Sequence, residues 1–177
     1  MWWGRSRPPA FKERSGKMAA ESAGRIRVKE SGMVLQVTSN EMGERVHQSD
    51  WKGDPYQLWQ IQEVGGSGSY RIVNEQSGLV LEVANWGTQR EAAVTQHGWH
   101  GEANQLWQIQ EVGGSGYYRI MGKGSGLALD IRDWGKKRGD PAQLWDWHGG
   151  DNQLFAVEQV GSTGPGPTGD QGSFVVE

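Results

Sequence analysis

The side chains best suited to chemistry gather in the last third of the chain. They comprise a carboxylate, an indole and three amides: Asp130, Trp145, Gln143, Asn152 and Gln153. The aspartate directly follows an apolar run at 127–129, and Gln143 and Trp145 alternate along a second strand-like run, so both should point to one face. The other two amides come after a tight Gly149-Gly150 turn. These groups could therefore meet on one shallow surface.

This combination of groups suits a saccharide ring. Vicinal hydroxyls both donate and accept hydrogen bonds, so a carboxylate beside an amide can bracket two of them. The C–H face of a pyranose is apolar and lies well on an indole. Binding pockets pair such a platform with a few convergent polar groups. The alternative is that Asp130 only caps a loop and that Trp145 is buried, but the presence of the whole set favours carbohydrate binding.

The elements that must position these residues belong to a threefold repeat. Gln57-Leu58-Trp59, Gln105-Leu106-Trp107 and Gln153-Leu154-Phe155 begin at intervals of 48 residues, at 57, 105 and 153. A second shared phrase lies upstream of each, with an Arg-Ile pair followed by Ser-Gly and an apolar run, at 25–35, 71–81 and 119–129. A period of this length is typical of a repeat architecture.

Each repeat contains about four short strand-like runs separated by stretches rich in Gly, Asn, Ser and Gln. No segment has a sustained helical period, and three four-stranded units are too few for a propeller. We therefore predict an all-β protein, a β-trefoil of about twelve strands with pseudo-threefold symmetry. The predicted domain spans 24–164, with repeats 24–69, 70–117 and 118–164. Trp59, Trp107 and Phe155 should lie in its core, and the glutamine two residues before each should bind loop backbone.

The three repeats differ at the positions of the candidate site. The second repeat offers a weaker version with a carboxylate and amides but no indole: Glu82, Thr95, His97, Asn104 and Gln105. The first has neither the carboxylate nor the asparagine, so we expect it not to bind in this way. Trp86 and Trp134 follow the acidic positions of the second and third repeats. They should lie on the loop over each site, either contacting the ligand or packing within the loop.

Composition excludes several classes of function. A net charge of −3 does not indicate nucleic-acid binding, and no apolar run is long enough to span a membrane. The lack of cysteine excludes disulfides and a thiol nucleophile. The four histidines have no spacing that indicates a metal site. No catalytic or nucleotide-binding motif is present. A second carboxylate near Asp130 could imitate the catalytic pair of a glycosidase, but sugar-binding sites need carboxylates for binding anyway. We expect no catalytic residues, cofactor or metal.

The two ends of the chain stand outside the repeats. Residues 1–23 have five basic and two acidic side chains and two tryptophans, and 165–177 are rich in Gly and Pro, so both are interpreted as tails. Because two of the three sugar sites look altered, an alternative function remains, in which the trefoil is a structural or protein-interaction scaffold with degenerate sugar sites and the basic tail with its two tryptophans is the docking segment.

The stretches 125–130 and 143–153, together with the triple Gln-x-Trp/Phe motif, resemble the ricin-B-type lectin family, especially the bacterial modules attached to glycosidases. The resemblance covers about 24–160. It implies a β-trefoil that binds galactose-like or xylan/arabinan-like sugars. It also implies that Asp130 and Asn152 hold hydroxyls, that Trp145 stacks on the ring, and that Gln143 and Gln153 support them. The expected partners are glycans or polysaccharides, with a homo-oligomer or a parent enzyme as further options.

The chain departs from that family in two ways. Members often have a disulfide in each repeat, whereas here a tryptophan faces a small residue at the matching places: Val34 with Trp51, Val80 with Trp99, and Ala128 with Trp147. We expect these tryptophans to be structural. The resemblance suggests an extracellular protein, yet the first residues lack the apolar core of a secretory signal. The location therefore stays open between outside the cell and the cytoplasm.

Overall fold

The computed structural model describes residues 23–160, and this part of the chain contains twelve β-strands and five short 3-10 turns. The strands are β1 (Gly24–Val28), β2 (Val34–Gln36), β3 (His47–Ser49), β4 (Trp59–Glu63), β5 (Tyr70–Asn74), β6 (Val80–Val83), β7 (Val94–His97), β8 (Trp107–Glu111), β9 (Tyr118–Gly122), β10 (Ala128–Ile131), β11 (Ala142–Trp145) and β12 (Phe155–Gln159). The prediction of an all-β trefoil with about twelve strands is confirmed.

Six of the strands close into a barrel. The hydrogen-bonded neighbours run from β1 to β4, β5, β8, β9 and β12, and β12 pairs again with β1. Closure leaves the barrel without the unpaired edges that isolated hairpins would expose. Each repeat supplies two of the six barrel strands, which explains why a single repeat cannot bury its own apolar face.

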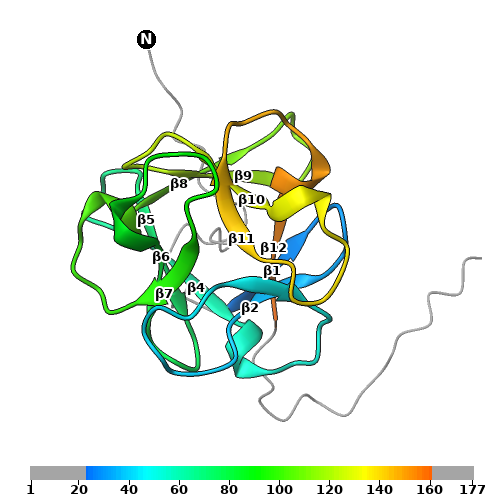
Figure 1. The fold of residues 1–177 in the computed structure, drawn as a ribbon, viewed down its shortest axis with the longest axis horizontal. Coiled ribbons are helices and arrows are strands. Elements are labelled where there is room, and N and C mark those ends of the chain that lie inside the picture. Colours follow the sequence, from blue (N-terminus) through cyan, green and yellow to red (C-terminus); the bar gives the residue numbers. More distant parts are fainter. Residues whose placement is uncertain (1–22, 161–177) are drawn as a thin grey trace, which may run out of the picture.

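The remaining strands form three hairpins, β2–β3, β6–β7 and β10–β11. They are joined cyclically by bridges between Arg45 and Thr95, Ala93 and Gln143, and His47 and Pro141. Figure 1 shows the result as three similar lobes around a common centre. The third lobe, formed by β10 and β11, positions the candidate site. Its neighbour along the chain, β6–β7, presents the degenerate copy.

The core contains the three repeated aromatic residues, as predicted. Trp59, Trp107 and Phe155 are 2%, 0% and 0% exposed. The two indole N–H groups donate to backbone carbonyl oxygens, Trp59 to Leu35 at 2.9 Å and Trp107 to Leu81 at 3.1 Å. These bonds connect the fourth strand of a repeat to its own hairpin. Each indole therefore fixes the position of the hairpin through a hydrogen bond, in addition to burying apolar area.

The glutamine of each Gln-x-Trp motif binds the loop that precedes it, which confirms the prediction for this residue. Gln57, Gln105 and Gln153 donate to the carbonyl oxygens of residues 50, 98 and 146 at 2.6, 2.7 and 2.8 Å. Their side-chain oxygens accept the backbone N–H of residues 52, 100 and 148 at 2.8, 2.8 and 2.9 Å. Each glutamine therefore holds one loop beside the end of a hairpin.

The tryptophans at the family's disulfide positions have partners that the sequence did not indicate. The guanidinium groups of three equivalent arginines lie 5.0 to 5.3 Å from the ring centroids, pairing Arg25 with Trp51, Arg71 with Trp99 and Arg119 with Trp147. Trp99 is still 39% exposed. A cation over the ring face thus contributes to fixing each loop, a contribution that was not part of the structural role expected for these tryptophans.

The predicted N-terminal tail up to residue 22 and the predicted C-terminal tail 165–177 lie outside the described residues. The alternative function for the basic tail therefore stays a prediction. Within residues 23–160, no helix has the length and apolar character needed to cross a membrane.

Candidate functional site

The site of the third repeat is built on the hairpin β10–β11 and on the 3-10 turn Asp151–Gln153. Asp130 and Gln143 are direct cross-strand partners, and Trp145 follows Gln143 by two residues on the same face. The 3-10 turn contributes Asn152 and Gln153. The five residues singled out in the sequence are therefore brought together.

Asp130 is the centre of their hydrogen-bond network. Its Oδ1 accepts from Gln143 Nε2 at 3.0 Å, and its Oδ2 accepts from Asn152 Nδ2 and Gln153 Nε2, both at 3.0 Å. Asn152 also donates to the carbonyl oxygen of Ile131 at 3.0 Å. Three amides thus hold the carboxylate in one orientation, which preorganises it for a ligand.

The network leaves two amide oxygens without a partner among the described residues. They are Gln143 Oε1 and Asn152 Oδ1, on side chains that are only 3% and 2% exposed. A buried polar atom without a hydrogen bond costs free energy, and such atoms in a native protein call for an explanation. Here they belong to residues that line a cavity, so a hydroxyl-bearing ligand could supply the missing donors.

The pKa of Asp130 is raised above the ordinary aspartate range. Burial is the main cause, because desolvation disfavours the charged carboxylate. The hydrogen bonds from Gln143, Gln153 and Asn152 and the proximity of His148 act in the opposite direction. Burial therefore disfavours the charged form of Asp130, and the hydrogen bonds from its amide partners partly offset this effect.

A small cavity opens beside this network, with a volume of about 130 Å³. Four of the predicted residues line it, namely Asp130, Gln143, Trp145 and Asn152, together with Asp133, Trp134 and His148. Gln153 does not line the cavity and is 0% exposed. It therefore holds the carboxylate of Asp130 from the buried side, by a hydrogen bond to Oδ2. Trp145 is only partly buried, which removes the alternative that it belongs to the core.

Trp134 and His148 form a wall of the cavity. Their rings are stacked at 5.1 Å with an interplanar angle of 29°, and Trp134 is 50% exposed. The loop position expected for Trp134 is confirmed, while His148 was missed. A signal for it existed: His148 follows Trp145 by three residues, just as His100 follows His97 in the second repeat.

The loop that presents Trp134 has an unusual backbone. Asp133 and Trp134 both have φ of 54°, and Asn85 and Trp86 repeat this feature at 54° and 52°. Two successive non-glycine residues in the left-handed region are costly, and such strain concentrates at functional sites. The strained turn places an exposed indole at the mouth of the cavity.

One contact on Trp145 could not be foreseen. The guanidinium of Arg90, from the second repeat, lies 5.3 Å from the centroid of the Trp145 ring and forms an ion pair with Asp146. Arg90 does not line the cavity. It instead contacts the indole from the neighbouring lobe, which helps to orient the ring.

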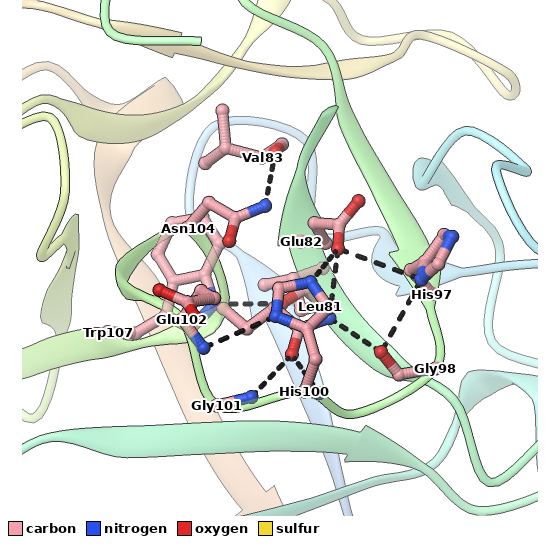
Figure 2. A network of polar contacts seen from close by, with 11 residues as sticks. Leu81, Glu82, Val83, His97, Gly98, His100, Gly101, Glu102, Asn104 and Trp107 are labelled. Atoms are coloured by element: carbon pink, nitrogen blue, oxygen red, sulfur yellow. Dashed lines mark hydrogen bonds and ion pairs between the residues drawn. The ribbon is translucent and has the colours of Figure 1, made fainter. Parts of the chain in front are cut away.

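The second repeat has a related but different arrangement, shown in Figure 2. Glu82 is paired with Thr95 across the hairpin and accepts from Gln105 Nε2 at 2.9 Å. The amide of Asn104 donates to the carbonyl oxygen of Val83 at 3.1 Å. Thus Asn104 makes no described bond to Glu82, unlike its counterpart in the third repeat. His97 and His100 lie beside Glu82 instead.

In the first repeat, the position of the carboxylate is occupied by Gln36. This glutamine accepts from Gln57 Nε2 at 2.9 Å and contacts His47 Nε2 at 3.0 Å. Tyr56, at the asparagine position, donates to Asn40 Oδ1 at 3.2 Å. These polar groups of the first repeat are satisfied by one another, and that this repeat does not bind a sugar in the same way stays a prediction.

Comparisons with known proteins identify the fold family. The model of the ricin-type β-trefoil lectin domain-like family matches residues 16–97 and 103–164. No curated protein sequence matches significantly. Among solved structures, the designed threefold-symmetric protein ThreeFoil is 31% identical, with a TM-score of 0.76 over 78% of this chain and 99% of its own.

Two natural proteins illustrate the range of the fold. The exo-β-1,3-galactanase 1,3Gal43A from Clostridium thermocellum is 30% identical with a TM-score of 0.77, and the match covers 81% of this chain but only 31% of the galactanase. The Macrolepiota procera ricin B-like lectin, solved in complex with lactose, is 16% identical with a TM-score of 0.70, covering 81% of this chain and 99% of the lectin. With its three Gln-x-Trp/Phe repeats and its closed barrel, the chain belongs to the ricin-type β-trefoil lectin domain-like family.

Proposed function

We propose that this protein is a non-catalytic carbohydrate-binding module or lectin, and that its third repeat binds a pyranose. One observation carries the proposal: a buried carboxylate, held by three amides, lies in a cavity that is also lined by two tryptophans. A hydrophobic platform and a few oriented polar groups are the usual composition of a ligand site. Belonging to a lectin-like family agrees with this function.

In the proposed complex, two vicinal hydroxyls donate to Asp130 or to the unpartnered oxygens of Gln143 and Asn152. The C–H face of the sugar stacks on the indole of Trp145. Trp134, which stands at the edge of the cavity, adds a second apolar contact. Gln153 contributes indirectly because it fixes the carboxylate. The second repeat, with Glu82, Thr95, His97, Asn104 and Gln105, is at most a weaker sugar site, since no indole stands at its platform position.

Galactose-like sugars are the first candidates, followed by xylan- or arabinan-like ones. The galactanase from Clostridium thermocellum, at 30% identity, supports the first choice. One shallow site would bind a monosaccharide at about millimolar affinity, or roughly −4 kcal/mol. Useful retention on a glycan would therefore require several sites, an oligomer or attachment to a parent enzyme.

The test is a glycan array followed by calorimetry with the best-bound sugar. Trp145→Ala should abolish binding, because it removes the stacking platform. Trp51→Ala is the matched control: it removes a partly exposed indole from the first repeat and should leave affinity unchanged. Equal binding by wild type and Trp145→Ala would refute the third repeat as the site.

The competing scaffold function has its own outcome. If no glycan binds and deletion of residues 1–23 abolishes self-association, the trefoil serves as a scaffold. Retained glycan binding by the deletion variant would support the lectin function and separate it from any role of the tail.

A further inference from the structure

The degenerate site of the second repeat brings together three potential metal ligands. Glu82 comes from β6, His97 ends β7, and His100 lies in the loop before the 3-10 turn Ala103–Gln105. Each offers one ligand atom, and the three atoms lie within 4.8 Å of one another. Figure 2 shows the two imidazole rings turned toward the carboxylate. Their spacing along the sequence had not indicated this convergence.

The distances are close to those of a metal site. Glu82 Oε2 lies 3.2 Å from His100 Nε2 and 3.9 Å from His97 Nδ1. Tetrahedral zinc bonds nitrogen and oxygen at about 2.0–2.2 Å, which separates neighbouring ligand atoms by about 3.3 Å. The separation from His100 is already close to this value. The separation from His97, and the one between the two imidazole nitrogens, which is within 4.8 Å, must shorten by small side-chain rotations. The histidine side chains are 42% and 31% exposed, so they have room to rotate.

The carboxylate is the fixed point of the cluster. Glu82 is 7% exposed, and its Oε2 is held by Gln105 Nε2 at 2.9 Å. Gln105 is itself held by the carbonyl oxygen of Gly98 at 2.7 Å. Such outer partners orient metal ligands in proteins. The exposed side of the cluster leaves access for an ion and for a water molecule as a further ligand.

The third repeat provides an internal comparison. There an aspartate replaces the glutamate, and His148 Nε2 lies 3.8 Å from Asp130 Oδ2. Trp145 stands where the second repeat has His97, so the second imidazole is absent. Three amides also occupy the carboxylate of Asp130, whereas Gln105 is the one amide that bonds to Glu82 among the described residues. The histidine at position 97 therefore removes the sugar platform from the second repeat and completes a two-histidine, one-carboxylate set with Glu82 and His100.

We propose that Glu82, His97 and His100 form a binding site for a divalent transition-metal ion of the zinc type. Imidazole and carboxylate are ligands that suit zinc, and two histidines with one glutamate form a known zinc ligand set. In the metal-free protein, the backbone N–H of Glu102 faces His100 Nδ1 at 3.3 Å, so the proton of this ring resides on Nε2. Metal binding at Nε2 moves that proton to Nδ1 and breaks the long contact with Glu102; the adjacent Gly101 allows the loop to adjust. His97 Nδ1 contacts the carbonyl oxygen of Gly98 at 3.4 Å and therefore carries a proton, which moves to Nε2 of the same ring when Nδ1 binds the metal.

The experiment is titration of the full-length, tag-free protein with zinc chloride by calorimetry, and with cobalt(II) by visible absorption. We expect one ion per chain with a dissociation constant below about 100 µM, and absorption bands of cobalt bound by nitrogen and oxygen. His97→Gln and His100→Gln should each weaken binding by more than the roughly 10- to 100-fold that loss of an outer partner causes. Zinc should raise the melting temperature of the wild type but not of these variants.

His47→Gln is the matched control, since it removes a hairpin histidine from the first repeat. It should bind zinc like the wild type. Glu82→Gln tests the carboxylate separately, and circular dichroism of every variant verifies the fold. A wild-type dissociation constant weaker than about 100 µM, or equal zinc affinity in the wild type and in the folded His97 and His100 variants, would overturn the proposal.

Discussion

Replacing Asp130 separates its role in stability from its role in binding. In Asp130→Ala, the amino groups of Gln143, Asn152 and Gln153 lose their shared acceptor. Asn152 and Gln153 keep second acceptors on the backbone, whereas Gln143 has no other described one. One buried donor is thus fully unsatisfied, which costs about 1–3 kcal/mol. We expect the free energy of unfolding to fall by about that amount.

Asp130→Asn should behave differently because the structure offers a rearrangement. The oxygen of the introduced asparagine can accept from Asn152 and Gln153. Its amino group then faces Gln143, whose Oε1 has no partner in the described structure. At first the amino group of the introduced asparagine faces the amino group of Gln143, and both are donors. Rotation of the Gln143 amide by half a turn brings its Oε1 to this place, where it accepts a hydrogen bond. This variant should therefore be within about 1 kcal/mol of the wild type, whereas the alanine variant is not.

Sugar binding should be lost in both variants. A hydrogen bond to a charged group is worth about 1.5–3 kcal/mol, which corresponds to a loss of about 10- to 150-fold in affinity. Urea unfolding monitored by tryptophan fluorescence measures the stability, and calorimetry with the best-bound sugar measures the affinity. Undiminished binding by Asp130→Asn, or a loss of more than about 3 kcal/mol of stability in that variant, would refute the reasoning.

The pH dependence provides a second check on Asp130. Burial raises its pKa in the folded state above the unfolded value, so the folded protein binds this proton more tightly and gains stability as the pH falls through the folded pKa. At neutral pH the ionised carboxylate therefore stabilises the fold less than the protonated carboxyl would. The wild type should therefore gain stability relative to Asp130→Asn on acidification, within the range where the fold persists. A constant difference between the two proteins would contradict this assignment.

Three further results are expected. Sugar affinity should begin to fall at a higher pH than the ordinary aspartate pKa of about 3.9 would produce, because the pKa of Asp130 is raised by burial; calorimetry across the pH range measures this, and a titration at the ordinary value would contradict it. Trp107→Phe should lower the free energy of unfolding by about 1–3 kcal/mol, since the carbonyl oxygen of Leu81 loses its buried N–H partner; unchanged urea unfolding would show that the bond contributes nothing. Gly150→Ala should displace Trp134, because an added Cβ would overlap the indole; the variant should bind sugar more weakly, and an unaltered near-ultraviolet circular dichroism spectrum would count against the packing described here.

Much of the candidate site could be predicted because it depends on local geometry. Asp130 and Gln143 face each other across a hairpin, and Trp145 shares the face of Gln143 through strand alternation. The turn that follows returns Asn152 and Gln153 to the same hairpin. The period of 48 residues likewise predicted the trefoil, since each repeat needs its neighbours to bury an apolar face.

Contacts between loops and between repeats could not be obtained in this way. Arg90 reaches Trp145 from another lobe, and His148 becomes part of the cavity through its stacking on Trp134. The three-residue step between His97 and His100 appeared unsuited to a metal, yet the loop turns both rings toward Glu82.

The chain by itself thus determined the fold class, the three repeats, the core aromatics and the residues of the third-repeat network. These properties follow from periodicity and from hairpin register, which act over a few residues and are visible in the sequence. The tertiary structure alone decided which loop side chains meet, how deeply the carboxylates are buried and which oxygens lack partners. Such properties arise when the barrel closes, because closure sets the distances between residues that are remote along the chain.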